Sequence, residues 1–146
     1  MPARVVSIQL CSGHRQPMVR VDQAMAEAGL GLRGDHHARP ASARQVLLAD
    51  WEDLEGLELD PGTIKENLTV EGLGIMRLEP GTQLRVGSAV LELTSVCEPC
   101  FRMDEIRPGL KQALVGRRGM NSRVLEGGLI RVGDPIVVER AEAVAS

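Results

Sequence analysis

Aromatic residues are nearly absent: the 146 residues contain Trp51, Phe101 and no tyrosine. The hydrophobic core must therefore be built from Leu, Val, Ile, Ala and Met, which the 43% hydrophobic share supplies. Nucleic-acid binding by base stacking needs aromatic platforms, so this scarcity argues against it. Basic blocks are also missing and the net charge is −3, so we expect no nucleic-acid partner.

Long apolar runs are missing as well. No stretch approaches the roughly 20 apolar residues that cross a bilayer. The opening segment "MPARVVSIQLCSGHRQ" lacks the apolar length and the cleavage site of a signal peptide. We therefore expect a cytoplasmic protein without a membrane partner. The three cysteines are too few, and odd in number, for a disulfide framework.

Short Val/Leu/Ile runs punctuated by Gly, Pro and Asn are typical of a β-rich domain. The pattern predicts strands over 3–10 and 17–21, a strand or helix entry over 44–50, a hairpin over 81–96, and two or three strands within 121–139. Helical composition or spacing marks 22–29, 50–59 and 108–119.

No repeat, low-complexity segment or linker interrupts the chain, so residues 1–146 are expected to form a single domain. The best fit is a mainly β fold, a closed or nearly closed β-barrel with a few short helices, because closure removes edge strands. A mixed α+β sandwich is the fallback.

The segment "SVCEPCFRMDE" (95–105) places two cysteines three positions apart. With Cys11 and His14, Cys97 and Cys100 have ligand types and spacing that could make a Cys₃His zinc site. A thioredoxin-like redox pair is less favoured, because the nearest helix is expected to start only near Pro108. A third interpretation is that both are inert, small hydrophobic residues.

The surroundings of Cys100 argue against inertness. Pro99 cannot donate a ladder hydrogen bond, so Cys100 lies where the chain leaves the sheet. Arg102 and Arg107 follow, and nearby cations favour a thiolate. Such a thiolate can carry sulfur or bind a soft metal.

Three further loops carry candidate groups. The segment 31–38 contains Asp35, His36 and His37, and 65–72 contains Asn67. The segment 116–128 groups three arginines with glycines, a composition that can hold an oxyanion: Arg117, Arg118 and Arg123. Each loop also has an ordinary interpretation. The segment 31–38 could be a solvated turn, Asn67 could simply stabilise a turn, and 116–128 could be an exposed basic turn.

Six segments, in order, resemble the MOSC domain, named for the C-terminal part of molybdenum-cofactor sulfurases: "GLRGDHHA", "RQVLL", "PGTIKENLTVEGL", "PGTQLRVGSAVLELT", "EPCFRMD" and "RPGLKQALVGRRGMNSRVLEGGLIRVGD". The resemblance runs from about residue 29 to residue 137, and the short chain is similar to stand-alone bacterial members. It implies a β-barrel of the pyruvate-kinase-barrel type with small helices.

The resemblance also implies residue roles. The family's signature cysteine follows a proline near a strand end, which is Cys100 here; it is proposed to carry a persulfide or to ligate molybdenum. Asp35 and His36 fall on the Gly-Asp-x-His element, where the assignment could shift to His37. Glu66, Asn67 and Leu68 match a Glu-Asn-Leu element. At Cys97 the family has no fixed cysteine, so Cys97 is at most a resolving thiol.

The resulting expectation is a MOSC protein that binds molybdenum cofactor (molybdopterin), carries sulfane sulfur on Cys100, or both. It could act as a molybdenum-cofactor-dependent oxidoreductase or a sulfurtransferase. Four arginines are expected to hold the pterin phosphate: Arg102, Arg117, Arg118 and Arg123. Three residues are expected to line the pocket: Asp35, His36 and Asn67.

The resemblance covers neither an aminotransferase-like nor a ferredoxin-like domain. The sulfur donor, such as a cysteine desulfurase, or a reductase is therefore expected to be a separate protein. We expect a monomer or homodimer, with no pyridoxal phosphate and no zinc. The competing hypothesis is a non-enzymatic binding protein with structural zinc on Cys11, His14, Cys97 and Cys100.

Overall fold

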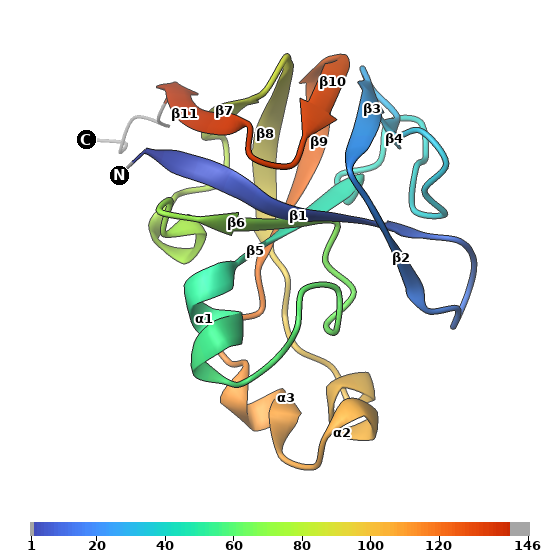
Figure 1. The fold of residues 1–146 in the computed structure, drawn as a ribbon, viewed down its shortest axis with the longest axis vertical. Coiled ribbons are helices and arrows are strands. Elements are labelled where there is room, and N and C mark those ends of the chain that lie inside the picture. Colours follow the sequence, from blue (N-terminus) through green and yellow to red (C-terminus); the bar gives the residue numbers. More distant parts are fainter. Residues whose placement is uncertain (1, 141–146) are drawn as a thin grey trace.

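The computed structural model describes residues 2–140 (Figure 1). Its strands are β1 Ala3–Cys11, β2 Met18–Val21, β3 Gln23–Glu27, β4 Gly31–Leu32, β5 Val46–Asp50, β6 Leu68–Glu71, β7 Gln83–Val86, β8 Ala89–Val96, β9 Met120–Glu126, β10 Gly128–Arg131 and β11 Pro135–Arg140. Its helices are α1 Trp51–Gly56, α2 Arg102–Ile106 and α3 Leu110–Ala113, with a 3₁₀ turn η1 at Ile75–Arg77. None of the helices in this part of the chain is long and apolar enough to cross a membrane.

Seven strands close into a barrel in the order β11-β7-β8-β9-β5-β6-β1, which confirms the predicted closed β-barrel. The ring closes where Ala3 of β1 pairs with Ile136 of β11. Neighbouring strands in the ring are antiparallel except β5 and β6, which run parallel. The strand β2 pairs with β1 outside the ring, and β10, β3 and β4 form a separate small sheet.

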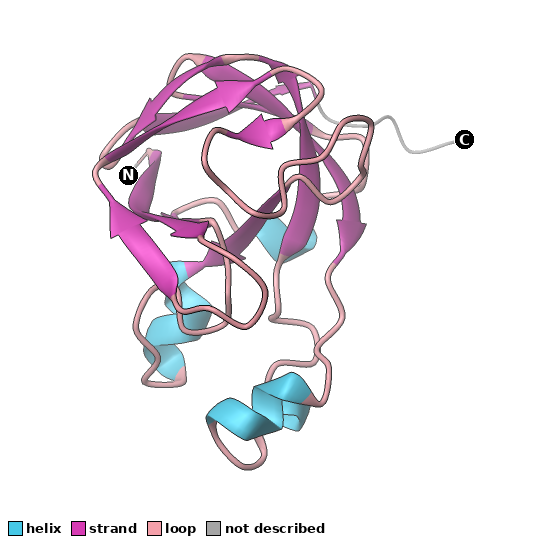
Figure 2. Cartoon of the chain, turned by 90° about the vertical axis from the view of Figure 1, so that its right-hand side faces the viewer, coloured by secondary structure: helices cyan, strands magenta, loops and turns pink. Residues whose placement is uncertain are grey.

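The barrel interior is filled by aliphatic side chains, as the lack of aromatic residues requires. Fully buried examples are Ile8, Leu48, Leu68, Leu84 and Leu91. A second, smaller apolar cluster lies under the helices and includes Leu54, Ile64, Met103, Leu110 and Leu114. Figures 1 and 2 show the helices α1, α2 and α3 below one end of the barrel. The loops that leave the barrel at this end therefore lie beside helices.

The predicted hairpin over 81–96 is confirmed as β7 and β8, which turn at Gly87 with a positive φ of 57°. The helix predicted over 22–29 is wrong. Residues Gln23–Glu27 form β3, which pairs with both β10 and β4. Its Ala24 and Ala26 are buried while the intervening residue is partly exposed, so the side chains follow the two-residue period of a strand.

The helix expected over 108–119 is reduced to the four residues of α3. A further helix, α2, begins at Arg102, only two residues after Cys100. The expectation that the helix nearest the cysteine pair starts only near Pro108 is therefore wrong, so the position of the helix does not argue against a redox pair. The amide of Met103 donates to the carbonyl of Cys100 at 3.0 Å, so Cys100 is tied to the first turn of α2.

Candidate functional site

Cys100 opens onto a cavity of about 530 Å³, which we name the cysteine cavity. Its walls come from the turn between β1 and β2, the loop after β4, the helix α2 and two further single residues. The lining residues are Cys11, Gly13, His14, Arg15, Gln16, His36, His37, Arg39, Lys65, Cys100, Arg102, Met103, Glu105, Ile106 and Arg118. All three histidines of the chain are among them.

The charges around the cysteine cavity are mostly positive. Five cationic side chains line it: Arg15, Arg39, Lys65, Arg102 and Arg118. Among the described residues, the only carboxylate that lines it is that of Glu105. That carboxylate lies 3.9 Å from the guanidinium of Arg15. The whole chain carries a net charge of −3, so this is a local reversal of sign. A concave surface with one sign of charge raises the local concentration of the opposite sign, so the cavity favours an anionic ligand.

Arg118 is the most unusual of these cations. Only 7% of its surface is exposed, yet its Nε and Nη1 atoms have no hydrogen-bond partner among the described residues. Leaving a buried donor of this kind unsatisfied costs about 1–3 kcal/mol. Because Arg118 lines the cavity, an anion bound there could accept from these atoms and remove that cost.

Asp35 and Asn67 lie beneath the cavity wall and do not line it. The carboxylate Oδ1 of Asp35 accepts from the amide of Cys11 at 2.7 Å and from Nδ2 of Asn67 at 3.2 Å. Asn67 also accepts from the amide of Leu47 and donates to the carbonyl of Gln9. These two residues therefore tie β1, β5 and the loop after β4 together, which sets the position of the residues that line the cavity.

Both histidines of the Gly-Asp-x-His element line the cavity, but only His37 pairs with its aspartate. The Nδ1 atom of His37 lies 3.8 Å from Oδ2 of Asp35, a fully buried oxygen that accepts no hydrogen bond among the described residues. The backbone of His36 donates to the carbonyl of Cys11 at 2.8 Å. The geometry therefore favours His37, rather than His36, as the histidine matched to Asp35.

Glu66 is completely buried next to Asn67. Burial raises the pKa of its carboxyl, and the amide of Gly62, the hydroxyl of Thr69 and the charge of Arg118 partly offset that shift. Its Oε2 accepts from Gly62 and Thr69, while Oε1 has no partner among the described residues. The buried, unpartnered side-chain atoms of the described chain thus belong to three residues around this site: Asp35, Glu66 and Arg118.

The three cysteines differ in their surroundings. Cys100 is exposed, Cys11 is buried and Cys97 is intermediate, and none forms a disulfide. Cys11 and Cys100 line the cavity, but Cys97 does not; its amide donates to the carbonyl of Gly119. Within residues 2–140, no three His, Cys, Asp or Glu side chains are grouped as a metal site, so the four residues of the zinc alternative are not assembled.

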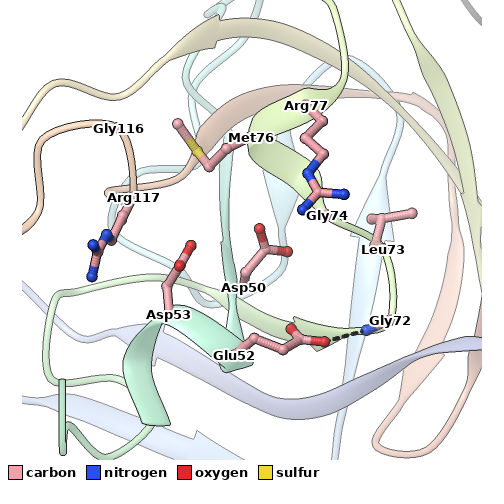
Figure 3. A pocket seen from close by; sticks show the side chains of 10 residues that line it. All are labelled: Asp50, Glu52, Asp53, Gly72, Leu73, Gly74, Met76, Arg77, Gly116 and Arg117. Atoms are coloured by element: carbon pink, nitrogen blue, oxygen red, sulfur yellow. Dashed lines mark hydrogen bonds between the residues drawn. The ribbon is translucent and has the colours of Figure 1, made fainter. Parts of the chain in front are cut away.

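The arginines expected to act together are separated. Arg102 and Arg118 line the cysteine cavity. Arg117 lines a different cavity, shown in Figure 3. Arg123 lies on the outside of β9, where it pairs with Glu92 at 2.6 Å. Arg107, expected to act near Cys100, donates to the carbonyl of Leu57 at 2.8 Å.

Eight of the lining residues had no predicted role: Gly13, Arg15, Gln16, Arg39, Lys65, Met103, Glu105 and Ile106. Lys65 and Arg39 immediately flank recognised motifs, since Lys65 precedes the Glu-Asn-Leu element and Arg39 follows the two histidines. A search for cations next to these motifs would have found both. Nothing in the sequence pointed to Arg15 or Met103.

Comparison with known proteins supplies the context for this geometry. The family model of the MOSC domain matches residues 34–137. Among solved structures, YuaD from Bacillus subtilis has a TM-score of 0.79 and 20% identity, covering 93% of this chain and 94% of its own. YiiM from Geobacillus stearothermophilus has a TM-score of 0.78 and 20% identity, and the match covers 95% of this chain and 76% of that protein. YiiM from Escherichia coli has a TM-score of 0.66 and 19% identity, and the match covers 98% of this chain and 72% of that protein. At these identities the likeness concerns the fold, and no curated protein matches the sequence.

Proposed function

The chain belongs to the MOSC domain family, and on that premise we propose that its cysteine cavity binds molybdenum cofactor, with the Cys100 thiolate as a ligand of the molybdenum. The observation that carries this proposal is Arg118, a buried guanidinium with two unpartnered nitrogen atoms in the wall of the cavity that contains Cys100.

The residues present fit such a group in three respects. The cofactor carries a phosphate, and the cavity offers five cations against one carboxylate. An exposed thiol is a suitable ligand for a soft metal, and Cys100 is the exposed cysteine of the three. The volume of about 530 Å³ is within the range of small-molecule sites, about 300–1,000 Å³.

The cations of the cavity and the residues behind its wall then have defined roles. Arg118, with Lys65 and Arg39, would hold the phosphate, and Arg102 would lie beside the thiolate of Cys100. Asp35 and Asn67 position the wall from behind, through their bonds to Cys11 and Leu47. When bound, the cofactor supplies two-electron oxygen-transfer chemistry, which suits the reduction of N-hydroxylated compounds. We propose that the electrons for such a reduction come from a separate reductase.

A second candidate function uses the same exposed thiol, which forms no disulfide. In sulfur transfer, the Cys100 thiolate attacks the outer sulfur of a donor persulfide, such as that of a cysteine desulfurase. The donor's S–S bond breaks, the donor leaves as a thiolate, and Cys100 holds the sulfane sulfur until an acceptor thiolate removes it. This route needs an accessible sulfur atom and does not use Arg118.

The decisive experiment compares protein purified from a host that makes molybdenum cofactor with protein from a host that does not. Molybdenum is measured by mass spectrometry, and the pterin by fluorescence after oxidation. We expect both to accompany the wild-type protein from the first host. Cys100→Ser should lose the molybdenum, while Cys97→Ser, which alters a thiol outside the cavity, should retain it.

Intact-mass analysis of the same samples separates the two functions. A sulfur adduct that disappears in Cys100→Ser but persists in Cys97→Ser, without molybdenum or pterin, would establish sulfur carriage in place of cofactor binding. Protein with neither adduct nor cofactor from the competent host would contradict both functions.

A further inference from the structure

A second cavity in the described chain lies away from Cys100. It has a volume of about 660 Å³, and we name it the aspartate cavity. Its lining residues come from the end of β5, α1, the loop between β6 and η1, η1 itself and the segment after α3: Asp50, Glu52, Asp53, Gly72, Leu73, Gly74, Met76, Arg77, Gly116 and Arg117. It shares no lining residue with the cysteine cavity.

Asp50 lies at the centre of this cavity, between Asp53 and Arg77 (Figure 3). Only 5% of its surface is exposed. Its Oδ1 accepts from the amide of Ile75 at 3.0 Å, and no cationic side chain of the described residues lies within 4.0 Å of the carboxylate. Asp50 occupies the N-cap position of α1 but makes no side-chain cap bond, so its hydrogen bonding ties η1 to the barrel.

Two guanidinium groups lie on opposite sides of the carboxylates. Figure 3 shows Arg117 on the side of Asp53 and Arg77 on the far side of Asp50. In the part of the chain that the structure describes, neither arginine forms an ion pair within 4.0 Å. The third carboxylate, Glu52, is occupied by the amide of Gly72 at 2.8 Å. Charges of both signs therefore face one cavity without pairing with one another.

We propose that the aspartate cavity is a second binding site, for a small zwitterion of the α-amino-acid class. The ammonium group of the ligand donates to Asp50 and Asp53, and its carboxylate accepts from Arg117 in the paired geometry of a guanidinium. The apolar part contacts Leu73 and Met76. A bare metal ion fits less well, because no three ligand side chains are grouped as a metal site within residues 2–140.

The electrostatics of the site support this ligand class. Burial, together with the charges of Asp53 and Glu52, raises the pKa of Asp50 to about 6, against the opposing amides of Ile75 and Met76. Burial also raises the pKa of Asp53, which Arg117 partly offsets. An ammonium group placed between the two carboxylates relieves their repulsion and favours their ionised forms.

The groups that face Asp50 are Glu52, Asp53, Arg77 and Arg117, and none of them is a histidine. Binding of an ammonium group should therefore follow the ionisation of Asp50. With a pKa of about 6, only about a tenth of Asp50 is ionised at pH 5, so affinity should fall about tenfold between pH 7.5 and pH 5.

The test screens the twenty protein amino acids one at a time by thermal shift on the full chain, and titrates those that raise Tm by calorimetry. Each ligand found is compared with the amine that lacks its carboxylate. We expect at least one amino acid to bind at pH 7.5, and its amine to bind at least about tenfold more weakly because the guanidinium contact is lost. Asp50→Asn should weaken both ligands by at least about tenfold, whereas Arg117→Gln should remove the advantage of the amino acid over its amine.

Matched controls keep the test specific. Asp22→Asn and Arg44→Gln remove exposed charges that line neither cavity, and they should bind the amino acid as the wild type does. Cys100→Ser should also bind it normally, so a failure of the proposed cofactor site is distinguishable from a failure of this one. The proposal is overturned if no amino acid raises Tm, or if binding survives Asp50→Asn.

Discussion

The cysteine cavity and the aspartate cavity diverge at two consecutive residues. Arg117 is exposed and lines the aspartate cavity, while Arg118 is buried and lines the cysteine cavity. The aspartate cavity has acidic and basic residues in near balance, whereas the cysteine cavity has five cations and one carboxylate. One short basic segment thus lines two cavities of different electrostatic character, which a count of charges along the sequence does not reveal.

The buried aspartates of the two regions differ in the same way. Asp35, behind the cysteine cavity, accepts hydrogen bonds from Cys11 and Asn67 through one oxygen. Asp50 accepts from the amide of Ile75 and lines the aspartate cavity, and its pKa is raised chiefly by burial. Asp35 therefore holds the wall of its cavity from behind, whereas Asp50 lies where it can contact a ligand.

The largest effect is expected from Asn67→Ala, which breaks the network behind the cysteine cavity. The substitution removes partners from Leu47, Gln9 and Asp35, and leaving such buried groups unsatisfied costs about 1–3 kcal/mol each, so the free energy of unfolding should fall by about 3 kcal/mol or more. Urea denaturation measures it. Asn121→Ala, which removes one bond to Ser95, should cost about 1 kcal/mol, and equal losses in the two variants would contradict the special role of Asn67.

Next in size is the pH dependence of stability that Asp50 introduces. Its pKa is about 6 in the folded protein against an ordinary value of 3.8, so the folded state binds more protons between these values and loses stability as pH rises through them. The loss is complete above pH 6 and amounts to at most about 3 kcal/mol.

Urea denaturation of the wild type and of Asp50→Asn, at pH 4 and at pH 7.5, measures this contribution. The variant keeps an oxygen for the amide of Ile75, so it should gain stability relative to the wild type as pH rises. Glu66 and Asp53 also have raised pKa values but titrate in both proteins, so the difference isolates Asp50. A difference that does not change with pH would mean that Asp50 titrates normally.

A smaller effect is expected from the two adjacent arginines. Arg118→Gln should lower the molybdenum and pterin content by at least about tenfold, because a charge-assisted contact to the phosphate is lost. Arg117→Gln should leave this content unchanged, since Arg117 lines the other cavity. Cofactor analysis of the two purified variants makes the comparison, and equal losses would show that the two cavities do not act separately.

The smallest effect is expected at Arg123, outside both cavities. Its pair with Glu92 is half exposed on the arginine side, and such surface pairs contribute about 0–1 kcal/mol. Arg123→Gln should therefore change the urea midpoint only slightly and leave cofactor content intact. A marked loss of cofactor would restore Arg123 to the site that the sequence suggested.

Regular hydrophobic patterns made much of the fold predictable. The alternation within 81–96 identified β7 and β8, and the periodic leucines of 50–59 identified α1. The segment 22–29 misled because alanine, glutamate and methionine favour helices, whereas pairing with β10 and β4 holds Gln23–Glu27 as a strand. The helix α2 was missed because its five residues are too few to show a period.

The sequence by itself determined the family, the barrel and the asymmetry of the cysteine pair, because each depends on residue order and local spacing: Pro99-Cys100 at a strand end, and motifs in a set sequence. Only the tertiary structure decided which side chains share a cavity. It placed His37 and Lys65 with Cys100, turned Arg117 away from Arg118, and left Asp50 facing a second cavity. Barrel closure brings distant loops together, and the direction of a side chain at such a junction depends on packing from segments far away in the chain.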